Sequence, residues 1–177
     1  MLMDKQTLFN LYDDVNSVLG FSNVNCAKHN CNFCETKISK SFLFPFEDEY
    51  LSIKNKIKIP VEERKVSGII IKNLKCGNGC KFYKNNRCSI QGCKPIECKI
   101  YPFLIWECRK SVNLELDLRC PEALSLRKDK AYLNKIFPPL KKFVNSLPRK
   151  FFIARGSLPS AMGSNIKMVK IAVLRKI

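Results

Sequence analysis

Cysteine is the residue type that most constrains this chain, which contains ten cysteines and a single histidine in 177 residues. Five of the ten lie between Cys76 and Cys98. Thiols at this density indicate either disulfide bridges or metal ligation, and soft thiolates select zinc, copper(I) or iron–sulfur clusters. Because a lone histidine leaves sulfur as the main soft ligand, the sequence predicts a metal centre held by thiolates.

The length and the N-terminal residues favour metal ligation over disulfides. A chain of 177 residues can bury a sizeable core, so it does not need the bridges of a small secreted scaffold. The first 19 residues lack a cationic start, and Asp4, Asp13 and Asp14 interrupt their apolar pattern, unlike a signal peptide. No apolar run approaches the ~20 residues of a membrane span. We therefore expect a cytoplasmic protein in a reducing compartment, with no membrane span.

Positive charge dominates the chain and is unevenly placed. The 32 lysines and arginines outnumber 15 acidic residues, for a net charge of +17, and Asp129 is the only acid from Arg127 onward. A basic face suits nucleic acid or an acidic protein. A lysine-rich composition from an AT-biased genome gives the same charge without any partner. The expected partner is a protein, and nucleic acid at the basic C-terminal segment is the second partner class.

Hydrophobic periodicity and turn residues predict alternating helices and hairpins. The expected helices cover residues 4–19, 45–58 and a helix at 127–147 that Pro138 and Pro139 break. The expected strands cover 41–44 and 66–71, with hairpins around Asn85–Asn86 and Arg109–Ser111. These elements predict a small α+β domain with short antiparallel hairpins, flanking helices and cysteine loops gathered around a metal centre. We place this domain at residues 1–147, followed by a basic extension, 148–177, that is either a short strand pair or a tail ordered by binding.

The spacing of the cysteines matches the needs of a metal site, in which two ligands close in sequence point at one ion. Cys31 and Cys34 are separated by two residues, and Cys76 and Cys80 by three. Four residues lie between Cys88 and Cys93, and four between Cys93 and Cys98. Four thiolates complete a zinc site or an iron–sulfur cluster. Ten cysteines exceed one site, so two sites, or one site with additional buried thiols, remain open. His29 is either a ligand or a polar surface group.

The segment Cys80–Phe103 resembles the core of the CxxCxxCC (YkgJ-like) cysteine-cluster family of zinc- or iron-chelating domain proteins. The resemblance rests on Cys88-Ser-Ile and on Tyr101-Pro-Phe, with a later Cys120-Pro121, while Lys94-Pro95 stands where the family has an Arg-Pro pair. The family's adjacent cysteine pair is replaced, since Glu35 follows Cys34 and Lys81 follows Cys80. The resemblance implies the following ligands: Cys31, Cys34, Cys80, Cys88, Cys98 and Cys120. Three more cysteines are candidates to replace lost ligands or to complete a second site: Cys26, Cys76 and Cys93.

The resemblance implies a metal-binding protein that holds an iron–sulfur cluster, 4Fe-4S in the first instance, or zinc instead. Its expected role is redox or metal-dependent and accessory to a partner. An Fe–S-dependent protein-modifying enzyme that resembles the lysine N-methylases in its cysteine pattern is the first alternative, although this chain is far shorter and has no identifiable donor site. A zinc-stapled nucleic-acid-binding module is the second alternative, favoured by the basic C-terminal third.

Overall fold

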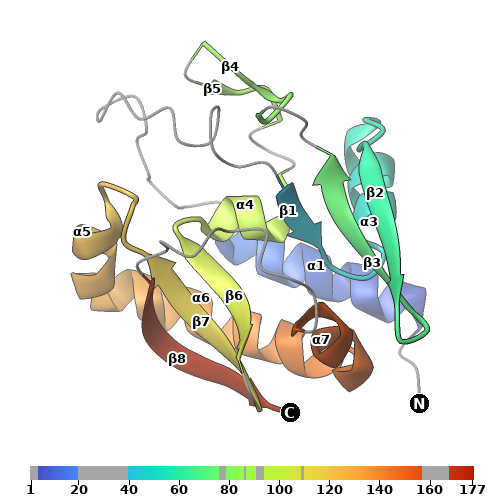
Figure 1. The fold of residues 1–177 in the computed structure, drawn as a ribbon. Helices are drawn as coiled ribbons and strands as arrows, with labels where there is room; N and C mark the ends of the chain where they lie inside the picture. The colour runs from blue at the N-terminus through green and yellow to red at the C-terminus, as the bar shows by residue number, and fades with distance from the viewer. Residues whose placement is uncertain are drawn as a thin grey trace.

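The computed structural model describes residues 4–19, 40–75, 79–85, 87–90, 94–108, 110–156 and 168–177, which form an α+β fold (Figure 1). The helices of these ranges are α1 (Lys5–Leu19), α3 (Glu47–Asn55), α4 (Ile96–Ile100), α5 (Ala123–Lys128), α6 (Lys130–Ser146) and α7 (Arg149–Gly156). The strands are β1 (Lys40–Leu43), β2 (Val61–Val66), β3 (Ile69–Lys75), β4 (Tyr83–Lys84), β5 (Arg87–Cys88), β6 (Phe103–Cys108), β7 (Ser111–Asp117) and β8 (Met168–Lys176). The predicted α+β class is confirmed.

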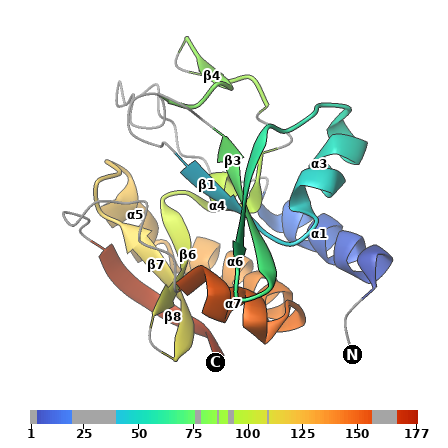
Figure 2. The ribbon, with the colours of Figure 1, turned by 45° about the vertical axis from the view of Figure 1, so that its right-hand side comes forward.

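Three small antiparallel sheets carry these strands, with the orders β1-β3-β2, β4-β5 and β6-β7-β8. Helix α6 packs against α1 and β8, and α4 packs against β1 and β6. Helix α7 contacts both β3 and β6, so it lies between the two larger sheets (Figure 2). None of the described helices is long and apolar enough to cross a membrane.

Helix α1 forms as its periodicity predicts. Its apolar positions, including Leu8, Tyr12 and Val15, are buried, and the Asp4 carboxylate accepts a hydrogen bond from the Thr7 backbone N–H at 2.9 Å. This bond satisfies one of the free N–H groups at the start of the helix. The Tyr12 ring lies 5.1 Å from that of Phe143, which in turn meets Phe44 edge-on. These three rings join α1, α6 and the end of β1 in one core.

Both predicted hairpins are confirmed. In the first, β4 pairs with β5, and Asn85 adopts a φ of 50°, a left-handed conformation that asparagine tolerates. In the second, β6 pairs with β7 from Phe103–Leu116 to Cys108–Ser111. The segment after Pro95 forms the short helix α4, which carries Cys98. The hairpin with Cys80 and Cys88 and the helix with Cys98 are thus the described parts of the cysteine-rich stretch Cys76–Cys98.

The single strand predicted at residues 66–71 is wrong, because a tight turn divides it. Ser67 and Gly68 have φ values of 49° and 78° and connect β2 to β3. Positive φ at both central residues is typical of a two-residue hairpin turn whose twist matches the strands. The Ser67-Gly68 pair was the sequence signal for this turn.

We expect Gly68→Ala to lower the free energy of unfolding by about 1–2 kcal/mol, because an L-residue is strained in the left-handed region. Nothing lies within 4 Å of the added Cβ, so the backbone alone carries the cost. Urea denaturation measures the change. Ser67→Ala is the control, since it replaces one L-residue by another at the same turn. Equal stability of the two variants would contradict the turn geometry.

The predicted break of the basic helix at Pro138 and Pro139 is wrong. Helix α6 continues through both prolines, and the chain breaks earlier, at Asp129, whose carboxylate accepts a hydrogen bond from the Tyr132 N–H at 2.8 Å. Pro138 is exposed and Pro139 partly exposed, so water can reach the carbonyl groups that lose their helical partners. The buried stripe of Ile136, Leu140 and Phe143 continues on the other side of the helix and stabilises it.

Two further expectations differ from the structure. The second helix, expected over 45–58, is α3, which is shorter because Phe46 and Lys56 adopt left-handed conformations at its two ends. The strand pair or tail expected beyond residue 148 is instead a helix and one strand: α7 buries Phe151 and Phe152, and β8 pairs with β7. The domain boundary at residue 147 stays a prediction.

Candidate metal centre

Four of the nine candidate ligands lie in the described residues: Cys80, Cys88, Cys98 and Cys120. The other five, Cys26, Cys31, Cys34, Cys76 and Cys93, lie outside them, as does His29. Within the described ranges, no group of three or more histidine, cysteine or acidic side chains is arranged to hold a metal ion. The described thiols therefore account for part of a donor set, and the predicted ligand set stays a prediction.

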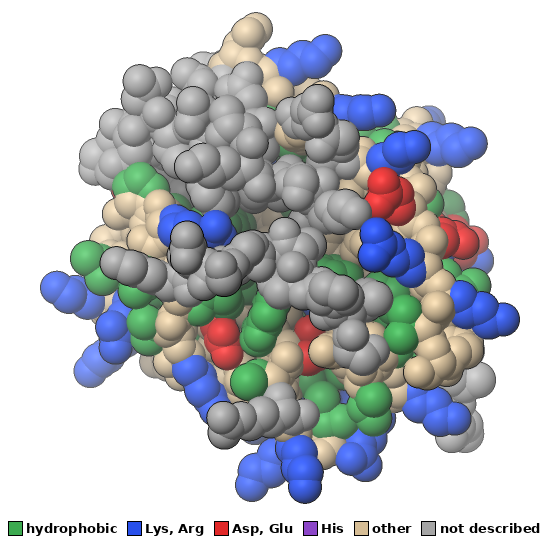
Figure 3. Space-filling model, viewed as in Figure 1, with side chains coloured by type: hydrophobic (Ala, Val, Ile, Leu, Met, Phe, Trp, Pro, Cys, Tyr) green, Lys and Arg blue, Asp and Glu red, His purple; other side chains and the backbone are tan. Residues whose placement is uncertain are grey.

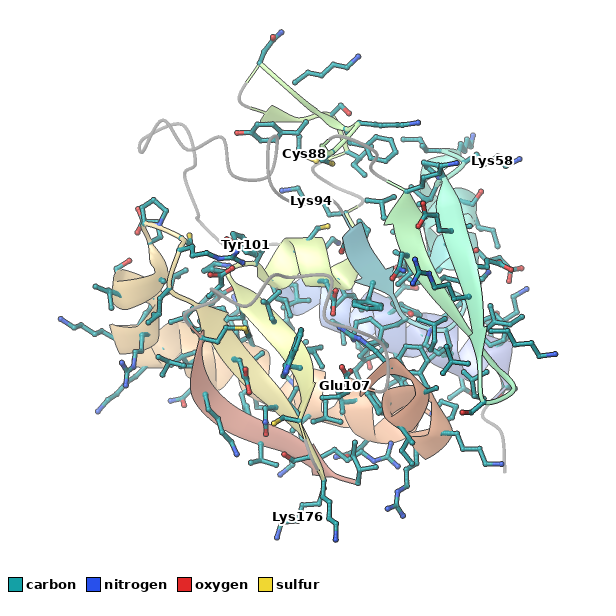
Figure 4. All side chains as sticks on the ribbon, in the orientation of Figure 1. Lys58, Cys88, Lys94, Tyr101, Glu107 and Lys176 are labelled. Atoms are coloured by element: carbon teal, nitrogen blue, oxygen red, sulfur yellow. The ribbon has the colours of Figure 1, made fainter. Side chains whose placement is uncertain are left out.

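Cys80 and Cys88 belong to the same hairpin. The Cys80 carbonyl accepts a hydrogen bond from the Tyr83 N–H at 3.0 Å, and Tyr83 pairs with Cys88 across β4 and β5. Both cysteines are partly buried. Figure 4 labels Cys88 on this hairpin, which projects beyond the larger sheets. The hairpin therefore carries two of the cysteines that the family resemblance implies as ligands.

Cys98 lies on α4, where its thiol donates a hydrogen bond to the Ser41 Oγ atom of β1 at 3.4 Å. Burial, together with the nearby Cys80 and Glu97, raises the pKa of the Cys98 thiol to about 12, although the hydrogen bond to Ser41 opposes the shift. Cys80 is thus close enough to Cys98 to influence its ionisation. A thiol in this setting keeps its proton at neutral pH unless a cation replaces it, as a bound metal ion does.

Cys120 and Cys108 have different surroundings. Cys120 lies where β7 leads towards α5 and is 6 % exposed within the hydrophobic core. Its carbonyl accepts a hydrogen bond from the Ala123 N–H at 3.0 Å, which helps to begin α5. Cys108 lies at the end of β6 and is exposed. It therefore offers a convenient control thiol.

Buried carboxylates surround the base of α4. Glu47, the first residue of α3, is 1 % exposed, and its two oxygens accept hydrogen bonds from the Phe44 N–H at 2.9 Å and the Ile96 N–H at 2.6 Å. Burial raises the pKa of Glu47 to about 8, although the two N–H groups oppose the shift. The Glu47 side chain fixes the start of α4 against the end of β1. It therefore also fixes the position of Cys98, which lies on α4.

Glu97 makes the second connection between α4 and β1. One oxygen accepts a hydrogen bond from the Phe42 N–H at 3.1 Å, and the other forms an ion pair with Arg155 of α7. Burial raises the pKa of Glu97, while the Arg155 guanidinium opposes this. Arg155 also lies 3.2 Å from the Glu107 carboxylate of β6, and burial raises the pKa of that carboxyl to about 7. Figure 4 shows Glu107 between β6 and α7.

Sequence reasoning missed these supporting residues. Glu97 and Arg155 are separated by 58 positions, and local spacing carries no information about their contact. A weak signal existed, because Arg155 ends a run of otherwise apolar residues, Phe151–Ala154, and Glu97 stands between Ile96 and Cys98. Charged residues inside apolar runs indicate buried ion pairs.

Comparison of the chain with family models, with curated proteins and with solved structures finds no match.

Proposed function

We propose that this protein binds a metal centre through cysteine thiolates, with an iron–sulfur cluster as the first candidate and zinc as the alternative. The single observation that carries the proposal is the setting of Cys98: a partly buried thiol on a short helix, bonded to Ser41 of β1 and electrostatically coupled to Cys80, with Glu47 fixing the start of the helix. Pre-oriented thiols are what a metal site requires of its ligands. Cys80, Cys88 and Cys98 are the proposed ligands among the described residues.

The chemistry of these side chains fits such a centre in part. Thiolates bind iron and zinc strongly, and the partial burial of Cys98 would limit the access of water to a bound ion and so influence its potential. The three thiols proposed as ligands are fewer than the four that a closed site uses. The remaining ligands would come from the other candidates: Cys26, Cys31, Cys34, Cys76, Cys93 and Cys120.

We expect the protein purified without oxygen to be brown and to contain about four iron and four sulfide ions per chain. Cys98→Ser should lose most of this iron, because the hydroxyl is a poor ligand for a soft metal. Metal and sulfide analysis with the visible spectrum measures both proteins. Cys108→Ser is the matched control, since it changes an exposed thiol on β6 and should keep the iron content.

Two other results of the metal analysis would change the proposal. Stoichiometric zinc in a colourless protein would identify the alternative centre, whose role is to stabilise the fold. A wild-type protein with no bound metal, in which every thiol reacts at once with a thiol reagent, would contradict the proposal.

A nucleic-acid-binding role is the second candidate, and the charge of α5 and α6 favours it. Asp129 is the only acid from Arg127 to Lys150, and exposed cations such as Lys130 and Lys141 lie along this stretch. On the face shown in Figure 3, however, lysine and arginine side chains are spread around the edges rather than gathered in one patch. Binding to RNA or DNA that weakens steeply with salt would support this role.

A further inference from the structure

Arg155 reaches from the C-terminal end of α7 into the interior between the two larger sheets. Its side chain is 3 % exposed, and its guanidinium lies 4.3 Å from the centre of the Phe42 ring. One terminal nitrogen, Nη2, donates both to the Glu97 carboxylate and to the Ile105 carbonyl of β6, the latter at 3.1 Å. Through these bonds Arg155 connects α7, α4 and β6 at one point.

The Glu97 carboxylate links Arg155 to the part of β1 that binds Cys98. Its second oxygen accepts the Phe42 N–H, and the adjacent Cys98 thiol donates to Ser41. Two consecutive residues of α4 are therefore bonded to two consecutive residues of β1. A rotation of Glu97 that broke its bond to Phe42 would also shift the thiol bonded to Ser41.

The energetics of the ion pair argue for a positioning role. Burying a charged pair costs desolvation energy, and well-packed apolar residues at the same place often stabilise a fold as well or better. Arg155 is not ideally hydrogen-bonded: its Nη1 atom lies 3.2 Å from Glu107 Oε1 as an ion pair without hydrogen-bond geometry, and its Nε atom makes no hydrogen bond among the described residues. What the arginine provides, and an apolar residue would not, is a fixed orientation for Glu97.

We propose that Arg155 is a positioning residue for the metal centre, which orients Cys98 through Glu97 and so makes α7 a structural part of the site. This inference rests on the proposed function, in which Cys98 binds the metal. The Arg155 side chain touches neither the metal nor the thiol; it holds β1 and α4 in the register in which Ser41 accepts the thiol proton.

Cobalt(II) is the probe for the test, because its thiolate complexes absorb strongly in the near ultraviolet. Titration of the metal-free full chain is expected to show about 10–100-fold weaker cobalt binding for Arg155→Met, the loss typical of residues that orient metal ligands. Arg155→Lys keeps the charge near Glu97 and should recover part of the affinity. An Arg155→Met variant that is folded and binds cobalt as tightly as the wild type would overturn the inference.

Arg175→Met is the matched control. Arg175 lies on β8. It also donates to backbone carbonyls, those of Val144 and Leu147, and lies beside the Phe152 ring, but none of these contacts involves Glu97. A general loss of stability should affect both variants, whereas a loss of cobalt affinity should be confined to Arg155→Met. Equal losses of affinity in the two variants would also overturn the inference.

A readout without metal separates the two proposals. In the metal-free protein at fixed pH, mass spectrometry measures the rate at which iodoacetamide modifies Cys98. Losing a hydrogen bond to a charged group is expected to make Cys98 in Arg155→Met react at least about tenfold faster than in the wild type or in Arg175→Met. If the wild type binds neither cobalt nor iron and sulfide, the proposed function fails, and this rate alone decides the positioning role: unchanged reactivity overturns it.

Discussion

Phe143→Ala is expected to lower the free energy of unfolding by about 3–5 kcal/mol. Phe143 is completely buried on α6, and its ring lies 5.1 Å from both the Tyr12 ring of α1 and the Phe44 ring that follows β1. Truncation removes the burial of the ring and leaves a cavity beside the two aromatic side chains that it contacts.

Urea denaturation, followed by circular dichroism, measures this change. Leu124→Ala is the control, because it removes an apolar side chain that is 63 % exposed on α5, and it should change stability by less than about 0.5 kcal/mol. A loss below about 1 kcal/mol for Phe143→Ala would show that α6 does not pack against α1 as described.

The metal-free protein is expected to lose stability as the pH rises from about 4.5 to about 8. Burial raises the folded-state pKa of Glu47 from 4.5 to about 8 and that of Glu107 to about 7, whereas in the unfolded chain both return to ordinary values. Below the unfolded pKa both states bind the proton, and the stability is fully present. Between the two pKa values the folded state binds more protons, so each group lowers the free energy of unfolding by up to roughly 1.4 kcal/mol per pH unit.

Glu47→Gln tests this assignment, because glutamine keeps the shape of the side chain without an ionisable group. The slope of stability against pH should become shallower in this variant between about pH 5 and 8, whatever the change in absolute stability. Glu63→Gln is the control, since its side chain is 51 % exposed, and its slope should equal that of the wild type. A wild-type stability that rises over this range would contradict the burial of protonated carboxyls.

Local patterns predicted the elements that depend on local interactions. The capped, amphipathic α1 and the hairpin at Asn85 follow from side-chain periodicity and turn chemistry. The errors have physical causes. Pro138 and Pro139 are tolerated because tertiary packing of the opposite face of α6 outweighs the lost hydrogen bonds, and α7 is short, with its apolar residues too closely grouped to give a helical pattern.

The candidate site was predictable only as a list of residue types. Cysteine spacing indicates which thiols are near in sequence, but the proximity of Cys80 and Cys98 depends on how the β4–β5 hairpin and α4 are placed. The support from Arg155 depends on a contact across 58 positions. Contacts of this kind are set by the packing of whole elements, which periodicity does not encode.

The position of Arg155 in the chain has a consequence for biosynthesis. Translation produces β1 and α4 well before α7, so Glu97 emerges from the ribosome while its cationic partner has yet to be made. Until 58 further residues have been added, this acid has no arginine to offset its burial. The thiols of Cys80 and Cys98 are therefore synthesised before the arginine that fixes Glu97, and under the proposed function a metal would meet the complete site only after α7 has been made.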